Sequence, residues 1–162
     1  MEVNERIVNT WLNTVKKHFT VSCLDYGKFH NDIDILSVNL QTNEVWDCEI
    51  KVRTGSTKIT NSTDKTNGFI HFVGTFNDPQ RLNAVNVFLP KKEFILKRKF
   101  ITTKSLFGSE KNKTKWVSKF GKEDIEVVFF DEITKDLADY AKTLKKSNNE
   151  ILQILRLLFI NQ

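Results

Sequence analysis

Cysteine is scarce in this chain, because Cys23 and Cys48 are the only thiols among 162 residues. They are far apart in the sequence, no CxxC pair is present, and no secretory segment stands at the start. A disulfide framework or a structural zinc site needs more cysteines, or cysteines and histidines at close spacing. We therefore expect two ordinary buried thiols and a cytoplasmic protein.

Long apolar runs are also missing. The best candidate, at 151–160, is short and is interrupted by Gln153 and Arg156. A membrane-spanning helix needs about 20 apolar residues. We therefore expect no membrane partner, and we interpret this segment as a packing helix or a dimer surface.

Several catalytic signatures are absent. His18, His30 and His71 do not have the spacing of metal ligands, and histidines of this kind are more often structural than catalytic. The chain has no glycine-rich phosphate loop, no GxSxG elbow and no dinucleotide fingerprint. The sequence therefore offers no sign of a nucleotide-binding enzyme or a serine hydrolase.

What the chain does contain is aromatic core material and basic charge. Thirteen Phe and three Trp, with 40% hydrophobic residues, predict one packed domain over residues 1–162. The net charge is +5, and most of the excess lies in a basic region at 91–122 that also carries aromatic residues. Such a region permits contact with nucleic acid, although a solvated lysine-rich surface explains the same composition.

The hydrophobic periodicity predicts an α/β domain with a mixed central sheet flanked by helices. Apolar residues at helical spacing predict a helix over 3–19, and β-forming residues predict a strand over 19–24. A polar loop is expected at 54–68, and a polar, lysine-rich segment follows at 103–115. Further strands are predicted at 32–38, 45–53, 69–76, 84–89, 93–102 and 125–130, and one or two helices at 133–160 with a break near 147–149.

Two of these strands, 32–38 and 45–53, form a hairpin with an unusual distribution of charge. If they pair antiparallel about the turn at 40–43, Asp34 lies opposite Glu49, and Asp32 lies opposite Lys51. The other face is then apolar and needs cover from a helix or a second layer. That apolar face consists of Ile33, Ile35, Trp46, Cys48, Ile50 and Val52.

Carboxylates this close repel each other unless a cation lies between them. Oxygen ligands with several retained waters suit Mg²⁺, so we expect a Mg²⁺ site, or else a raised carboxylate pKa. We expect that Mn²⁺ can replace Mg²⁺ at this site. Asp34 and Glu49 are the candidate ligands, and Asp32 competes with Asp34 for this role. Lys51 lies on the same face, where it is placed to hold an attacking water or to stabilise charge on a phosphate.

Asp34 followed by Ile-Leu-Ser-Val, then Glu49-Ile50-Lys51, resembles the PD-(D/E)XK nuclease superfamily, which includes restriction endonucleases and archaeal Holliday-junction resolvases. The resemblance covers about the first 53 residues, and Ile33 stands where the family has Pro. It implies a restriction-endonuclease-like core and a Mg²⁺-dependent endonuclease acting on DNA. Asp34 and Glu49 would bind the metal, Lys51 would assist the water, and Glu5 on the preceding helix would complete the site. Glu5 equally suits the positive end of its own helix.

The same interpretation predicts a DNA surface and a homodimer, because cutting two strands is simplest with two copies of one site. Two alternatives remain open. The first is a nucleic-acid-binding module of this fold without catalysis, and the second is a protein-interaction domain in which the acids form only surface ion pairs. The predicted phosphate contacts are Arg53, Lys58, Lys65, Lys97, Arg98 and Lys99.

Overall fold

The computed structural model describes residues 1–162 except 28–30, 54, 56, 90–93 and 160–162. Its centre is a five-stranded mixed sheet in the order β1-β2-β3-β4-β5. The first three strands pair antiparallel, and β3, β4 and β5 are parallel. The predicted α/β class and mixed sheet are confirmed. The strands are β1 (Phe19–Tyr26), β2 (Asn31–Asn39), β3 (Glu44–Lys51), β4 (Ile95–Thr102) and β5 (Ile125–Phe129).

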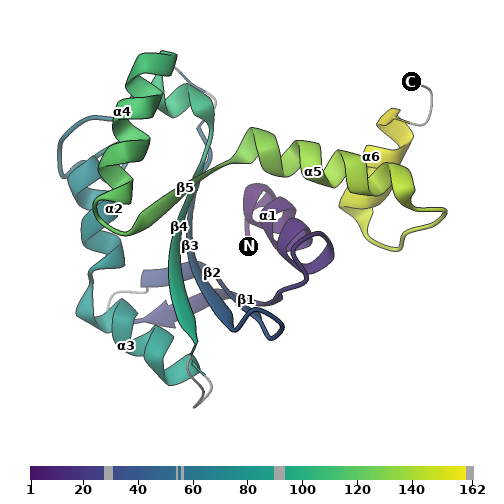
Figure 1. The fold of residues 1–162 in the computed structure, drawn as a ribbon, viewed down its shortest axis with the longest axis horizontal. Coiled ribbons are helices and arrows are strands. Elements are labelled where there is room, and N and C mark those ends of the chain that lie inside the picture. The colour runs from purple at the N-terminus through teal and green to yellow at the C-terminus, as the bar shows by residue number, and fades with distance from the viewer. Residues whose placement is uncertain (28–30, 54, 56, 90–93, 160–162) are drawn as a thin grey trace.

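Helices cover both faces of this sheet, which gives three layers. Figure 1 shows α1, α5 and α6 on one side of the sheet, and α2, α3 and α4 on the other. A short 3₁₀ helix, η1, follows β4. The helices are α1 (Val3–Thr14), α2 (Phe69–Phe76), α3 (Pro79–Phe88), η1 (Lys104–Phe107), α4 (Glu110–Gly121), α5 (Phe130–Thr143) and α6 (Glu150–Phe159).

The core on the α1 side confirms that a helix covers the predicted apolar face. Val8 and Leu12 of α1 pack in one buried cluster with Ile35, Cys48 and Ile50 of the sheet. Trp46 and Val52 lie against the same cluster. Residues of α5 complete this core, so α1 is held between the sheet and the C-terminal helices.

The other face carries two apolar clusters. One is rich in phenylalanine and joins Phe72 of α2 and Phe120 of α4 to Phe100 of β4. The second joins Val85 of α3 to Ile33 and other apolar residues of the antiparallel strands. Helices α2 and α3 are thereby fixed over the face that carries Asp47 and Glu49, which contact Arg81 of α3.

The strand predictions for 69–76 and 84–89 were wrong, because 69–76 form helix α2 and 84–88 lie in helix α3. Short apolar runs do not distinguish a strand from a buried helix. In α2 the buried residues Phe69, Phe72 and Phe76 recur at helical spacing. In α3 the Asp78 side chain accepts a hydrogen bond from Gln80 N, and Pro79 occupies the first turn, an arrangement that starts helices.

Other element boundaries also differ from the predictions. Helix α1 ends at Thr14 rather than residue 19, and the polar segment 103–115 contains η1 and the start of α4. Strands β4 and β5 and the break between α5 and α6 are confirmed, although residue 93 lies outside the described residues. Cys48 is buried as predicted, but Cys23 is exposed.

Helix α6 is only partly covered. Leu152 is buried against the α1 core, whereas Ile154, Leu157 and Leu158 are exposed. These residues fit either form of the prediction, a packing helix or a dimer surface. Among the helices of the described residues, none is long and apolar enough to cross a membrane.

The α1 core generates a stability prediction. Leu12→Ala removes a fully buried side chain beneath the sheet and is expected to lower the free energy of unfolding by about 2–5 kcal/mol in a urea titration. Leu157→Ala is the matched control, because that side chain is 71% exposed and its loss should cost less than about 0.5 kcal/mol. Equal effects of the two changes would contradict the packing described for α1.

Candidate functional site

The predicted register of the hairpin is confirmed where β2 and β3 pair. Their ladder runs from Asn39 opposite Glu44 to Ile35 opposite Cys48, and it ends one step before Asp34 and Glu49. Beyond that point the Asp34 carboxylate accepts a hydrogen bond from Ile50 N at 2.5 Å. Asp34 therefore lies where the two strands separate, and its side chain bridges the gap.

The neighbouring strand β1 is distorted at the same place. Ser22 pairs with Ile35 and Leu24 pairs with Ile33, but Cys23 and Asp34 between them are missing from the register. Cys23 has a φ of 54°, a left-handed conformation that is strained for a residue with a side chain. Both neighbours of β2 thus leave the backbone around Asp34 open.

This distortion explains one wrong prediction. Ile33 was expected to share a face with Ile35, but it packs with Leu36 in the core beneath α3. Alternation along a strand has a period of two only while the pleat is regular. The irregular step at Asp34 sends Ile33 to the opposite layer.

A polar pocket of about 440 Å³ opens at this point of the sheet. It is formed by the start of α1, the open part of β1 and β2, and the end of β3 and the residues after it. The pocket therefore brings together residues that are distant in the chain. Its lining residues include Glu5, Cys23, Asp32, Asp34, Lys51 and Arg53.

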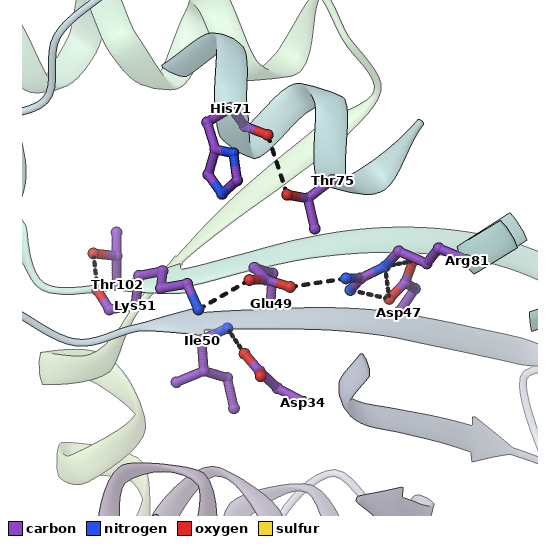
Figure 2. A network of polar contacts seen from close by, with 9 residues as sticks. All are labelled: Asp34, Asp47, Glu49, Ile50, Lys51, His71, Thr75, Arg81 and Thr102. Atoms are coloured by element: carbon purple, nitrogen blue, oxygen red, sulfur yellow. Dashed lines mark hydrogen bonds and ion pairs between the residues drawn. The ribbon is translucent and has the colours of Figure 1, made fainter. Parts of the chain in front are cut away.

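A line of charged contacts runs from Lys51 into the α3 layer (Figure 2). Lys51 Nζ lies 3.1 Å from Glu49 Oε1, and Glu49 Oε2 accepts a hydrogen bond of 2.8 Å from Arg81. Arg81 also donates three hydrogen bonds of 2.7–3.2 Å to the two oxygens of Asp47. Asp34 lies on the other side of β3 from Glu49 in this view, so the two acids do not share one face of the hairpin as regular pairing predicted. Asp34 lines the pocket, whereas Glu49 points toward Arg81.

Arg81 is the principal residue that sequence reasoning did not assign to the site. It is fully buried and lies over the rings of Phe76 and Tyr26. Burial opposes its charge, but Asp47 and then Glu49 outweigh this effect, so the pKa of Arg81 is raised. The available signal was the spacing of Asp47 and Glu49, which places two acids on one face of a strand and calls for a cation.

The charges of this network do not cancel. Asp34, Asp47 and Glu49 supply three carboxylates, while Lys51 and Arg81 supply two cations. Burial, followed by repulsion from Glu49, raises the pKa of Asp34 to about 7. The network therefore holds one carboxylate in excess, and the pKa of Asp34 is raised accordingly.

Lys51 behaves differently. Burial alone would lower the pKa of Lys51, but the charges of Glu49 and Asp34 outweigh it and the pKa is raised. The ammonium consequently keeps its proton at neutral pH. It can donate hydrogen bonds and stabilise negative charge, but it is poorly suited to accept a proton.

The donor set fits a hard cation that keeps part of its water shell. Among the described residues none donates a hydrogen bond to Asp34 Oδ1, which leaves that oxygen available as a ligand. The described residues contain no group of three or more His, Cys, Asp and Glu that could hold a metal unaided. Mg²⁺ is typically bound by one or two carboxylates together with water and substrate oxygens, which suits Asp34, whereas Glu49 would have to release a contact with Lys51 or Arg81 to become a second ligand.

The two supporting acids have different positions. Glu5 accepts a hydrogen bond of 2.9 Å from Glu2 N in a capping box, as the helix-end alternative predicted. Glu5 also lines the pocket, and its charge contributes to the raised pKa of Asp34. Asp32 lines the pocket, but it is exposed and lies in the regular backbone ladder opposite Asp25 of β1. Asp34 is therefore the better-placed ligand.

The predicted phosphate contacts do not form one group. Arg53 lines the pocket, and Lys58 donates a hydrogen bond of 2.8 Å to the Ser105 carbonyl beyond the end of β4. Lys65 is exposed, and its charge adds to the lowering of the pKa of His71 that burial causes. The three basic residues of β4 are placed differently.

On β4, Lys97 pairs with Glu44, and Arg98 donates a hydrogen bond of 3.0 Å to Asn77 Oδ1. Lys99 is only 3% exposed, pairs with Glu126 and lies 4.2 Å from the centre of the Trp46 ring. Its burial on the α1 face removes Lys99 from any surface that contacts DNA.

His71 lies closer to the network than the sequence indicated. Figure 2 shows its ring pointing from α2 toward Lys51 and Glu49. Burial lowers the pKa of His71, and the charge of Glu49 opposes that shift. His18 is buried beside Ser37 on the other face, and His30 lies outside the described residues.

The buried arginine generates a second prediction. Arg81→Met leaves Asp47 buried without its cation and should lower the free energy of unfolding by roughly 3–5 kcal/mol. Arg98→Met, which removes a guanidinium with a single neutral partner, should cost less than about 1 kcal/mol. Chemical denaturation compares the two, and a small loss for Arg81→Met would show that the buried pair is dispensable.

The excess carboxylate predicts a pH dependence of the metal-free protein. The folded state raises the pKa of Asp34 from 3.8 to about 7, so ionisation of Asp34 lowers stability as the pH rises through this window. The side chain of the Asp34→Asn variant stays neutral. The free energy of unfolding of this variant should therefore rise relative to that of the native protein by up to about 4 kcal/mol, because one pKa unit corresponds to about 1.4 kcal/mol. Urea titrations in EDTA between about pH 4 and pH 8 measure this gain. A difference that is constant across the range would contradict the shift.

Comparisons with known proteins add nothing to this geometry. No family model matches the chain, and neither the curated proteins nor the solved structures contain a significant match. The interpretation of the site therefore depends on its own residues, their contacts and their charges.

Proposed function

We propose that this protein is a Mg²⁺-dependent endonuclease that hydrolyses DNA phosphodiester bonds, with the restriction-endonuclease-like core that the resemblance implies. The observation that carries the proposal is the presence of Asp34 and Lys51 in one polar pocket, with Glu49 in contact with Lys51 and with one carboxylate in excess in this buried network. A buried negative charge without a partner is unfavourable, and a divalent cation relieves it.

Each residue has a separate role in this proposal. Asp34 and Glu49 hold the cation, and Arg81 fixes Glu49 from the α3 layer. A bound Mg²⁺ would activate water and neutralise charge on the phosphate. Lys51 remains protonated, orients the attacking water and stabilises the negative charge that develops on the phosphate. Glu5 and Asp32 support the site from the pocket wall.

The basic charge of the chain supports a polyanionic substrate. The net charge is +5, and the parallel strands β3, β4 and β5 end on the same edge of the sheet as the pocket. In α/β folds, ligands usually bind outside the carboxyl ends of such strands. Arg53 and Lys58 lie just beyond the end of β3 on this edge. This arrangement supports DNA as the substrate.

One observation favours a second candidate, a DNA-binding module of the same fold without catalysis. Both carboxylate oxygens of Glu49 already contact cations, Oε1 through Lys51 and Oε2 through Arg81. If these contacts persist in the presence of Mg²⁺, Glu49 is a structural acid and the pocket binds a phosphate without cleaving it.

The cytoplasmic location and the homodimer stay predictions, and the exposed apolar residues of α6 supply a surface for the dimer.

The test is incubation with plasmid, single-stranded and branched DNA, with and without Mg²⁺ or Mn²⁺. The native protein should cleave at least one of these only with metal, and Glu49→Gln and Lys51→Ala should each reduce the rate by about 100-fold or more. Glu49→Gln keeps an oxygen facing Arg81, which protects the fold.

Glu123→Gln and Lys122→Ala are the matched controls, since both residues are exposed at the end of α4 and should leave the rate unchanged. Cleavage that survives both site changes would refute the site assignment. Binding without cleavage by the native protein would instead favour the inactive module.

A further inference from the structure

Arg53 has a donor that the fold leaves unused. Its Nε atom is buried, and no described residue accepts a hydrogen bond from it. Buried polar groups of folded proteins are nearly always hydrogen-bonded, so the protein does not use the full donor capacity of this guanidinium. Arg53 also lines the pocket with Asp34 and Lys51.

The backbone that carries Arg53 is held firmly in place. Thr103 Oγ1 donates a hydrogen bond of 2.6 Å to the Arg53 carbonyl, and Ser105 Oγ donates a second of 2.9 Å. Thr102 Oγ1 donates one of 2.7 Å to the Lys51 carbonyl. The end of β4 and the start of η1 thus fix the two residues relative to each other without using the Arg53 side chain.

An unpaired arginine at this position is not explained by the acids of the pocket. Glu5, Asp32 and Asp34 line the same pocket, yet no ion pair joins any of them to Arg53 among the described residues. Arg53 instead lies near a second cation, because its charge opposes the raised pKa of Lys51. Two neighbouring cations that line one pocket can bind an anion together.

We propose that Arg53 and Lys51 form a phosphate-binding subsite, in which the guanidinium of Arg53 holds the nucleic-acid phosphate that faces Asp34. This inference depends on the proposed function for the identity of the anion. A guanidinium presents two parallel N–H groups to a phosphate, whereas an ammonium presents a point charge. Arg53 therefore supplies orientation, and Lys51 supplies charge.

The test measures binding and cleavage separately. Binding of fluorescein-labelled single-stranded and duplex oligonucleotides is titrated at several salt concentrations, with Ca²⁺ in place of Mg²⁺, and cleavage is measured with Mg²⁺. Arg53→Met should weaken binding by about tenfold and reduce the slope of log K against log[salt] by about 0.9 for duplex or 0.7 for single strands. Its KM should rise in proportion, while kcat changes by less than about twofold.

Two further variants sharpen the result. Arg53→Lys keeps the charge and should keep the native salt slope, but it should still lose about threefold in affinity because the planar guanidinium is gone. Arg156→Met removes the same charge from α6, away from the pocket lining, and should change neither quantity. Circular dichroism checks that each variant is folded.

The outcomes separate the two proposals. Native affinity and salt slope for Arg53→Met would overturn the subsite, even in a protein that cleaves DNA. A native protein that binds with the predicted Arg53 dependence but never cleaves would overturn the proposed catalysis and leave the subsite standing. Absence of any binding by the native protein would overturn both.

Discussion

The pairing of Arg81 with Asp47 and Glu49 is the interaction on which the site depends. Two acids spaced two apart on a central strand point into the layer between the sheet and the helices, where an unpaired charge is very unfavourable. Arg81 forms ion pairs with both carboxylates. These ion pairs fix α3 over β3 and give the Glu49 side chain one orientation. A buried ion pair of this type adds little net stability, but breaking it is costly. Its value here lies in holding a carboxylate still.

The irregularity of the antiparallel strands has a comparable role. Regular pairing through Cys23, Asp34 and Glu49 would leave the Asp34 backbone enclosed in the sheet. The ladder ends early on one side, and the strained Cys23 interrupts it on the other. Strain of this kind persists only where surrounding structure enforces it, and it is common at functional sites. The opening gives Asp34 access to the pocket and to the Lys51 ammonium.

Charge balance connects these two features to the proposed chemistry. Arg81 compensates part of the negative charge of β3, and Lys51 compensates more, but Asp34 remains in excess and shifts its pKa. The pocket consequently accepts positive charge near Asp34 and negative charge near Lys51 and Arg53. In the proposed function, a phosphate accompanied by a divalent cation supplies both charges at once.

The sequence by itself determined the local pattern of the site. Alternation of acidic and apolar residues specified the β2-β3 register, because a slip of one residue would expose the whole apolar face. That pattern also placed Glu49 and Lys51 on one face and predicted the helical cover supplied by α1. These features follow from neighbours along the chain or across one hairpin.

Only the tertiary structure decided the rest. The apolar runs of α2 and α3 fit a strand as well as a helix until packing selected the helix, against the phenylalanine core for α2 and against the antiparallel strands for α3. Arg81 and Lys99 are both basic residues in polar contexts, and their burial depends on acids and rings contributed by other elements. Ile33 changed faces because the distortion arises between strands rather than within one. The physical reason is the same in each case, since burial and charge pairing are set by elements that lie close in space but far apart in the chain.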